Sequence, residues 1–184
     1  MRIISGQYKG KRLIAPKNLP VRPTTDMAKE SLFNILNNRY YFQNISVLDL
    51  FSGTGNISYE FASRGTEHII SVDQNFHCIQ FIKKTIAQLQ FEKEITPFKS
   101  DVFKFLEKHQ SQYDFIFADP PYDFSEKQFL TIPHLIFENE LLHDDGLLIV
   151  EHSPHTDDLS NHPNFIERKK YGSVCFSFFQ KTSL

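Results

Sequence analysis

The chain has 184 residues, a formal net charge of −2 and 40% hydrophobic residues, with 19 Phe. A chain of this length and composition can bury one substantial core, so we expect a single domain. No run approaches about 18 apolar residues and no apolar segment opens the chain, which argues against a membrane-spanning helix or an exported protein. Cys78 and Cys175 are far apart, so we expect reduced thiols in a monomeric, cytoplasmic protein. The His residues show no ligand spacing, so we predict no metal site.

The first 22 residues are basic and contain no acid. Their cations are Arg2, Lys9, Lys11, Arg12, Lys17 and Arg22. Apolar residues on both sides of Gly6 and Gly10 predict a short β-hairpin that carries exposed positive charge. We interpret residues 1–22 as an N-terminal extension that binds a polyanion such as RNA through Arg2, Lys9, Lys11, Arg12 and Arg22. The alternative is an edge that only increases solubility.

Strand and helix patterns alternate through the remaining residues, 23–184. A helix over 24–38 begins near Thr24 or Thr25, either of which can cap it, and has Asp26 in its first turn. Strands are predicted at 46–51, 68–72, 94–98, 113–118 and 147–151, and helices near 56–64, 75–90, 102–109 and 125–138. This alternation indicates an α/β fold with a doubly wound, mostly parallel sheet. Two further strands, 165–171 and 174–179, form an antiparallel hairpin at the C-terminal end.

The most informative stretch is an apolar strand, 113–118, that ends in Asp119-Pro120-Pro121-Tyr122. Two successive prolines fix the backbone and remove two N–H donors, so the carbonyls of Asp119 and Pro120 stay available as acceptors. A carboxylate and a carbonyl can accept both hydrogens of a planar amine, and the Tyr122 ring can stack on the aromatic group that carries it. We therefore predict a site for the exocyclic amine of a nucleobase. The alternative is a plain Pro-Pro turn with a surface acid.

The first strand ends in a glycine-containing turn. It reads Asp49-Leu50-Phe51-Ser52-Gly53-Thr54-Gly55. In a doubly wound sheet, this turn normally receives the nucleotide part of a cofactor. Gly53 and Gly55 allow a close backbone approach, but Ser58 replaces the third glycine of a dinucleotide fingerprint, so a pyrophosphate is disfavoured. Asp49 is instead well placed for a cation such as an α-ammonium group.

Two later strands also end in acids. Asp73 ends the second strand at the distance where an acid reaches ribose hydroxyls, and Gln74 follows it. Asp101, with Val102 after it, follows the third strand and can bind an adenine amino group. It can equally well be only the N-cap of the next helix.

Together these motifs resemble a class I S-adenosylmethionine-dependent methyltransferase, a Rossmann-like fold of seven strands, that acts on an amino group. The N-terminal patterns Arg2-Ile3-Ile4-x-Gly6, Lys9-Gly10-Lys11 and Arg22-Pro23-Thr24-Thr25-Asp26 resemble, more narrowly, the bacterial family that methylates N2 of one guanine in small-subunit (16S) ribosomal RNA. Glu30-x-Leu32-Phe33-Asn34 and Lys170-Tyr171-Gly172 extend the resemblance from end to end. The segment Asn56-Ile57-Ser58-Tyr59 departs from the family pattern, in which smaller residues are usual, so the packing behind the cofactor is expected to differ.

The resemblance implies direct transfer of a methyl group from S-adenosylmethionine to an amine whose two hydrogens Asp119 and the Pro120 carbonyl accept, while Tyr122 stacks on the base that carries the amine. It also implies that Thr25 closes over the methionine end of the cofactor. The Asp-Pro-Pro-Tyr loop alone specifies only amine chemistry, because adenine-N6, cytosine-N4 and glutamine methyltransferases share it. A DNA adenine methyltransferase, a nicotinamide oxidoreductase and a non-catalytic RNA-binding assembly factor remain as alternatives.

Overall fold

The structure, a computed structural model, describes residues 1–17, 19, 24–156 and 158–181. The strands within these residues are β1 (Ser46–Leu50), β2 (His68–Asp73), β3 (Ile95–Lys99), β4 (Tyr113–Ala118), β5 (Leu142–His152), β6 (Phe165–Tyr171) and β7 (Val174–Phe179). The α-helices are α1 (Asp26–Asn37), α2 (Asn56–Ser63), α3 (Phe76–Leu89), α4 (Val102–Lys108) and α5 (Glu126–Glu138). Short 3-10 turns occur at Phe42–Asn44 and Leu159–Asn161.

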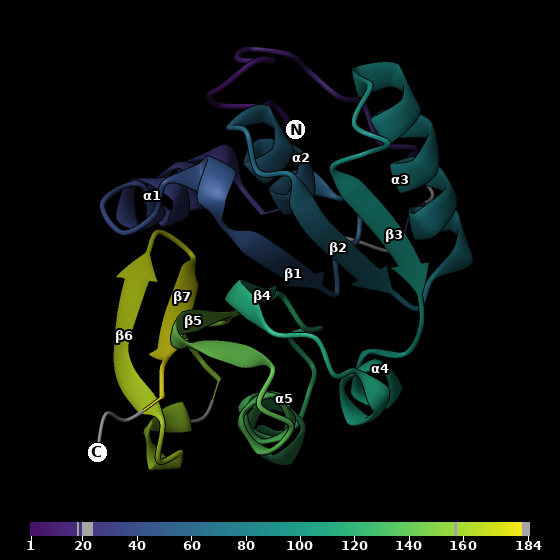
Figure 1. The fold of residues 1–184 in the computed structure, drawn as a ribbon. Helices are drawn as coiled ribbons and strands as arrows, with labels where there is room; N and C mark the ends of the chain where they lie inside the picture. Colours follow the sequence, from purple (N-terminus) through teal and green to yellow (C-terminus); the bar gives the residue numbers. More distant parts are fainter. Residues whose placement is uncertain (18, 20–23, 157, 182–184) are drawn as a thin grey trace.

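One seven-stranded sheet crosses the middle of the molecule in the order β3-β2-β1-β4-β5-β7-β6 (Figure 1). Strands β1 to β5 pair in parallel, whereas β7 pairs antiparallel with both β5 and β6. Helices α1, α2 and α3 lie on one side of the sheet, and α4 and α5 lie on the other (Figure 1). The α/β, mostly parallel fold with an antiparallel C-terminal hairpin is therefore confirmed.

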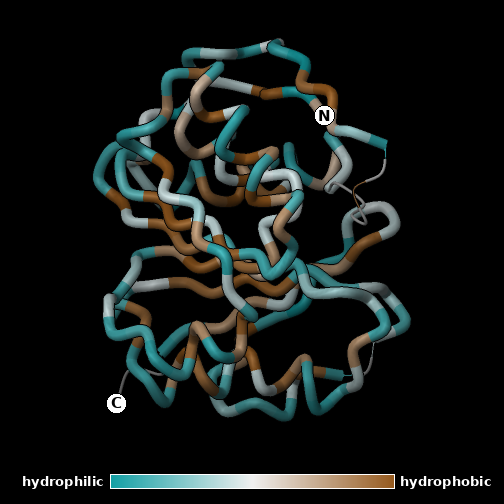
Figure 2. The backbone as a smooth tube through the Cα atoms, turned by 90° about the vertical axis from the view of Figure 1, so that its right-hand side faces the viewer, coloured by the Kyte–Doolittle hydropathy of each residue, from teal (hydrophilic) through white to brown (hydrophobic). Residues whose placement is uncertain are grey.

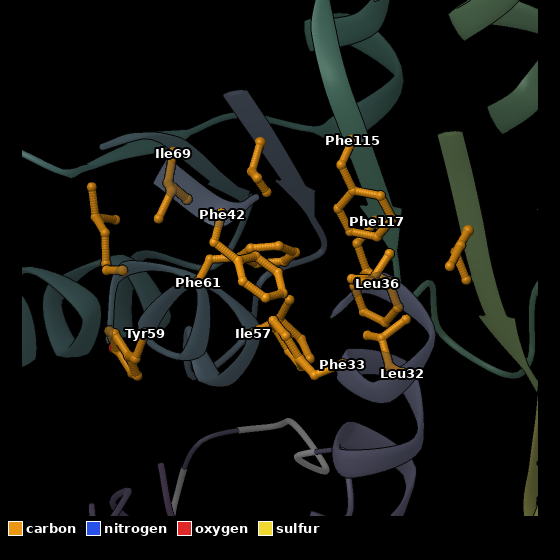
Figure 3. Close-up of a cluster of buried hydrophobic side chains, with 14 of the residues drawn as sticks. Leu32, Phe33, Leu36, Phe42, Ile57, Tyr59, Phe61, Ile69, Phe115 and Phe117 are labelled. Carbon is orange, nitrogen blue, oxygen red and sulfur yellow. The ribbon is translucent and has the colours of Figure 1, made fainter. Parts of the chain in front are cut away.

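Alternation along the strands divides the core between the two faces of the sheet. In β4, Phe115 and Phe117 belong to the cluster under α1 to α3, whereas Ile116 and Ala118 belong to the cluster under α4 and α5. The first cluster is rich in aromatic rings, and Phe61 packs against Phe33 and Phe115 at centroid distances of 4.7 and 5.4 Å (Figure 3). Hydrophobic segments gather along the sheet and hydrophilic ones toward the periphery (Figure 2). Burial on both faces explains why the central strand β4 is continuously apolar from Phe115 to Ala118.

The predicted helices begin close to where their capping residues place them. The Thr25 side chain accepts a hydrogen bond from the N–H of Ala28, so Thr25 is the N-cap of α1 and the helix begins two residues later than predicted. Ser125 and Gln128 form a reciprocal capping box at the start of α5. Each cap satisfies backbone donors that have no partner within the helix.

Strand β5 is longer than the sequence predicts. It begins at Leu142 rather than residue 147, and Tyr113 pairs with Leu142 before the register shifts. Residues 143–145 are exposed and polar, so their pattern predicts a loop, although they belong to β5 at the point where its register with β4 shifts.

The predicted N-terminal hairpin is present and short: Arg2 and Arg12 form an antiparallel bridge, and on either side of it the N–H of Ile3 donates to the Lys11 carbonyl and the N–H of Leu13 to the Met1 carbonyl. Beyond this pairing, the N–H groups of Ile4 and Ser5 donate to the Glu60 carboxylate of α2, at 2.8 and 3.0 Å. Gly6, with φ +81°, presses against α2 so closely that a Cβ would lie 1.8 Å from the Ser63 carbonyl oxygen. This segment is therefore bound to α2 rather than free.

Candidate active site

A cavity of about 890 Å³ opens where the order of the parallel strands reverses, between β1 and β4. Crevices at the carboxyl ends of strands in such sheets are the usual ligand sites. The cavity is lined by most of the residues that the sequence singles out: Thr25, Asp49, Phe51, Ser52, Gly53, Thr54, Asp73, Gln74, Asp101, Val102, Asp119, Pro120, Pro121 and Tyr122. Gly55 does not line it.

The glycine turn after β1 has a backbone that few residue types adopt. Phe51, Gly53 and Gly55 have φ values of 58°, 52° and 77°, all in the left-handed region. A Cβ on Gly55 would lie 2.7 Å from the ring of Tyr59, which is fully buried beneath the turn. Glycine is therefore needed at position 55, because the Tyr59 ring packs against the turn on the side away from the cavity. Tyr59 belongs to the segment 56–59 in which the family pattern usually has smaller residues.

The carboxylate of Asp73 joins this turn to the end of β2. One oxygen accepts a hydrogen bond from the N–H of Gly53 and the other from the N–H of Asn75, each at 2.8 Å. Asp73 is 8% exposed, so its remaining lone pairs face the cavity that it lines. Gln74, beside it, is exposed at the same edge.

Asp49 is buried at the end of β1, on the face of the sheet that α2 covers. The Ser58 hydroxyl donates to its carboxylate at 2.5 Å, and burial raises the pKa of Asp49 to about 7, partly offset by Ser58. A buried carboxylate with this pKa is a strong potential partner for a cation that enters the cavity. Thr54 lies nearby, and its buried hydroxyl finds no partner within the described residues.

Asp101 caps α4. Its side chain accepts a hydrogen bond from the N–H of Lys104 at 3.0 Å, which is one of the two roles that the sequence left open. Asp101 also lines the cavity, together with the buried Val102. Asp101 can therefore cap α4 and still contact a ligand in the cavity.

An aromatic wall that the sequence analysis missed stands next to Asp101 in the cavity. The rings of Phe103 and Phe124 stack at a centroid distance of 5.9 Å, and Phe51 meets Phe124 edge-on at 5.7 Å. All three residues line the cavity. Such a wall suits the flat face of a nucleobase. The Phe residues come from three separate loops and helices, so no local pattern reveals the wall.

The Asp119-Pro120-Pro121-Tyr122 loop forms another wall. The N–H of Asp119 donates to the carbonyl of Leu50 at 3.3 Å, which holds the start of the loop against β1. Burial raises the pKa of Asp119 well above its ordinary value, and the neighbouring carboxylates of Glu151 and Asp49 raise it further. Pro120 is buried and Tyr122 is exposed at the cavity edge.

Glu151, at the end of β5, is a second carboxylate in this wall and was not predicted from the sequence. It is 2% exposed and accepts hydrogen bonds from the hydroxyls of Thr24, at 3.2 Å, and Tyr122, at 3.1 Å. Burial raises the pKa of Glu151, whereas these two bonds lower it. In the sequence, Glu151 stands out only as an acid at the end of an apolar run, a position that Asp119 shares.

A buried charge connects the N-terminal segment to the cavity. The Lys29 ammonium of α1 lies fully buried 3.4 Å from the Glu60 carboxylate and donates to Asn56 Oδ1 at 2.8 Å and to the Arg2 carbonyl. Asn56 in turn donates to the Thr24 carbonyl at 3.1 Å. The polar residues Asn56 and Thr24 both line the cavity, so the basic segment and the cavity wall share one network.

The predicted RNA-binding cations lie outside the cavity lining. Arg2, Lys9, Lys11 and Arg12 are exposed, and the Arg2 guanidinium lies 3.4 Å from Asp26. Arg22 falls outside the described residues. Their surface position is compatible with the predicted contact to a polyanion, which stays a prediction.

Within the same described ranges, no group of three or more His, Cys, Asp and Glu side chains could hold a metal ion. No helix in them is both long and apolar enough to cross a membrane. Cys78 and Cys175 are buried and unpaired by disulfide.

Comparison with known proteins gives an end-to-end match. The family model described as conserved hypothetical protein 95 matches residues 1–180. YlbH of Bacillus subtilis (strain 168), provisionally named an rRNA methyltransferase, is 39% identical over 155 residues that cover 83% of this chain and 82% of YlbH. Ribosomal RNA small subunit methyltransferase D of Buchnera aphidicola is 30% identical over 189 residues, covering 100% of this chain and 93% of its own.

A solved structure agrees with these relatives. The yhhF protein of Escherichia coli, provisionally named a methyltransferase, superimposes with a TM-score of 0.86 at 25% identity, covering 100% of this chain and 99% of its own. The fold, the family model and the relatives thus coincide over the same residues. This chain therefore belongs to the conserved hypothetical protein 95 family, the family of bacterial ribosomal RNA methyltransferases that its sequence resembles.

Proposed function

We propose that this protein transfers a methyl group from S-adenosylmethionine to the exocyclic N2 amine of a guanine in small-subunit ribosomal RNA. The relatives support ribosomal RNA as the substrate class, and the Buchnera aphidicola relative is named a small-subunit methyltransferase. The observation that carries the proposal is the shared cavity: the acids predicted to hold the cofactor, Asp49 and Asp73, and the acid predicted to hold the amine, Asp119, line the same space.

The residues present fit S-adenosylmethionine. Asp73 offers free lone pairs for ribose hydroxyls, and Asp49 offers a buried carboxylate for the α-ammonium group. The aromatic wall of Phe51, Phe103 and Phe124 suits an adenine ring, with Asp101 at its edge for the amino group. The unpartnered hydroxyl of Thr54 gives one further polar contact. Thr25 also lines the cavity, and we assign it to the methionine end.

When bound, S-adenosylmethionine supplies a methyl group on a sulfonium that is already activated for displacement. The protein's task is mainly to position and polarise the amine. Asp119 and the Pro120 carbonyl would accept the two N2 hydrogens, which favours a pyramidal nitrogen with an available lone pair. The Asp119 carboxylate would offset the positive charge that develops on N2 as N2 gains the methyl group and the sulfonium sulfur is released as a neutral thioether. The surplus N2 proton then leaves to solvent.

Tyr122 completes the acceptor side. Its ring lies at the exposed edge of the cavity, where it can stack on a guanine that has left its own stack. The hydrogen bond from its hydroxyl to Glu151 fixes the direction of the side chain. The exposed cations of the N-terminal segment would then hold RNA phosphates near the cavity.

The proposal is tested with small subunits from cells that lack the enzyme, incubated with the purified protein and methyl-labelled S-adenosylmethionine. We expect about one methyl group per subunit, recovered as N2-methylguanosine at a single position. Labelled N6-methyladenosine, or label in DNA and not in RNA, would contradict the proposal. Naked 16S RNA and fully assembled subunits, assayed in parallel, identify which of the two is the substrate.

A further inference from the structure

Glu151 stands in the acceptor wall without a role in the chemistry described above. Its two oxygens each accept one hydrogen bond, from Thr24 and from Tyr122. A carboxylate has about four acceptor sites, so Glu151 can accept more bonds from a group that enters the cavity. Because the side chain is almost fully buried, a lone pair left unpaired there is costly.

The wall around Glu151 offers acceptors and few donors. Asp119 contributes a carboxylate and Pro120 a carbonyl, and the next residue, Pro121, has no N–H to add as a donor. The hydroxyls of Thr24 and Tyr122, which could donate to a ligand, are directed at Glu151 itself. A base whose edge consists of donors therefore matches this wall best.

The nucleobases differ in what stands beside their exocyclic amine. In guanine the neighbouring ring nitrogen, N1, carries a hydrogen, so the amine edge presents N1–H and both N2–H groups as donors. In adenine and cytosine the neighbouring ring nitrogen is an acceptor, and its lone pair would face a carboxylate lone pair. A wall in which carboxylate and carbonyl acceptors predominate thus fits the amine edge of guanine better than that of adenine or cytosine.

We infer that Glu151 is the specificity-determining residue that reads N1–H of the target guanine while Asp119 and Pro120 hold its N2 amine. This inference rests on the proposed function and adds the residue that separates guanine from the other bases with amines. The Glu151 oxygens reach the same cavity as Asp119, from the adjacent strand β5. Burial raises the pKa of Asp119, and the neighbouring Glu151 carboxylate raises it further.

A purely structural role for Glu151 makes a different prediction. Glu151 also fixes Tyr122 and Thr24, so its loss could slow methylation by disturbing the wall in general. Such a loss would lower the rate for every base by the same factor. A specificity role instead changes the ratio of rates between a base with N1–H and one without it.

The experiment therefore compares guanine with 2-aminopurine, which keeps the N2 amine but has an acceptor at N1. After the modified position has been mapped, small subunits are reconstituted with either base at that position. Wild type, Glu151→Gln and the surface control Glu138→Gln are compared by single-turnover transfer, by S-adenosylmethionine affinity and by 2-aminopurine fluorescence, which reports extrusion of the base. Gln can turn its amide to accept from N1–H or to donate to N1.

Wild type and Glu138→Gln are expected to favour guanine over 2-aminopurine by about 10-fold to 100-fold. Glu151→Gln is expected to reduce that preference to within about threefold, with unchanged cofactor affinity. An unchanged ratio in Glu151→Gln, or an equal fall for both bases, would overturn the inference while the proposed function stands. If wild type fails to methylate guanine at all, the proposed function itself has failed.

Discussion

The N–H of Gly53 donates to the carboxylate of Asp73 at 2.8 Å, so the glycine turn after β1 is fixed by the last residue of β2. The other Asp73 oxygen is bound to the N–H of Asn75 at the start of α3. One side chain therefore shapes the cavity wall and, in our proposal, binds the ribose. Its replacement must affect both functions.

Asp73→Ala is expected to weaken S-adenosylmethionine binding by about 1.5–3 kcal/mol, because charge-assisted hydrogen bonds to the ribose are removed. Asp73→Asn keeps one acceptor for the turn, so it should retain more affinity than Asp73→Ala. Calorimetry measures both, with thermal unfolding as the control for the fold. Equal affinity of a folded Asp73→Ala variant and wild type would remove Asp73 from the cofactor site.

Asp49 is expected to make cofactor binding depend on pH. Its pKa of about 7 means that the carboxylate is largely protonated in the empty protein below neutral pH, although binding of an ammonium group requires the ionised form. Affinity should therefore rise as pH increases from about 5.5 to 7, by up to about tenfold per unit. Asp49→Asn should bind more weakly and show a flat profile over this window, as calorimetry at each pH would reveal.

The same ionisation has the opposite effect on the stability of the empty protein. The folded pKa is raised above the ordinary aspartate value of about 4, so between these values only the folded chain holds the proton. Stability is therefore expected to fall as pH rises through this window, and Asp49→Asn should lessen the fall. Urea titrations that give parallel pH profiles for wild type and Asp49→Asn would contradict the assignment.

Much of the fold could be predicted because local signals and burial agree. Strands β1, β2, β4, β6 and β7 lie within one residue of their predicted bounds. The apolar run of β4 and the paired prolines after it mark the strand and its end without tertiary information. The end of β2 at Asp73 and the glycine turn after β1 follow from the same rules.

The rest depends on contacts between distant segments. Lys29 reads as an exposed helix residue, yet it is fully buried because Arg2, Asn56 and Glu60 surround its ammonium group. Glu151 reads as the end of a strand, and its role needs the position of the Asp119 loop on the adjacent strand. The N-terminal hairpin forms as predicted, but its attachment to α2 through the N–H groups of Ile4 and Ser5 and the Glu60 carboxylate depends on residues distant in sequence.

Lys29→Met is expected to destabilise the protein by about 1–3 kcal/mol, the cost of buried polar groups left without a partner. Methionine has a similar length but leaves the Arg2 carbonyl and Asn56 Oδ1 without their donor. Glu60 loses its ion pair with Lys29 and keeps the one with Arg64. Burial already lowers the pKa of Lys29, which the Glu60 charge partly restores, so the pair depends on both members. Urea unfolding gives the loss of stability, and hydrogen exchange should show faster opening of residues 3–5. A loss below about 1 kcal/mol would show that the network is dispensable.

The exposed N-terminal cations are expected to bind RNA phosphates. Replacing Lys9, Lys11 and Arg12 by Gln should weaken RNA binding and lower the log–log salt slope by about 0.7–0.9 for each phosphate that is no longer neutralised. Cofactor affinity should not change, because none of these residues lines the cavity. Replacement of three exposed lysines elsewhere, Lys83 and Lys84 on α3 and Lys108 on α4, serves as a charge-matched control. An unaltered salt slope would mean that these cations serve only solubility.

The central claim is that Asp119 holds the acceptor amine while other strands hold the cofactor. The most direct test measures S-adenosylmethionine affinity by calorimetry and single-turnover methyl transfer to small subunits on the same Asp119→Ala protein. We predict near-normal affinity and a transfer rate lowered by about 10²–10³, because one preorganised charged acceptor is removed. Near-normal transfer would contradict the claim, and loss of both affinity and transfer would show that Asp119 supports the cofactor site rather than the amine.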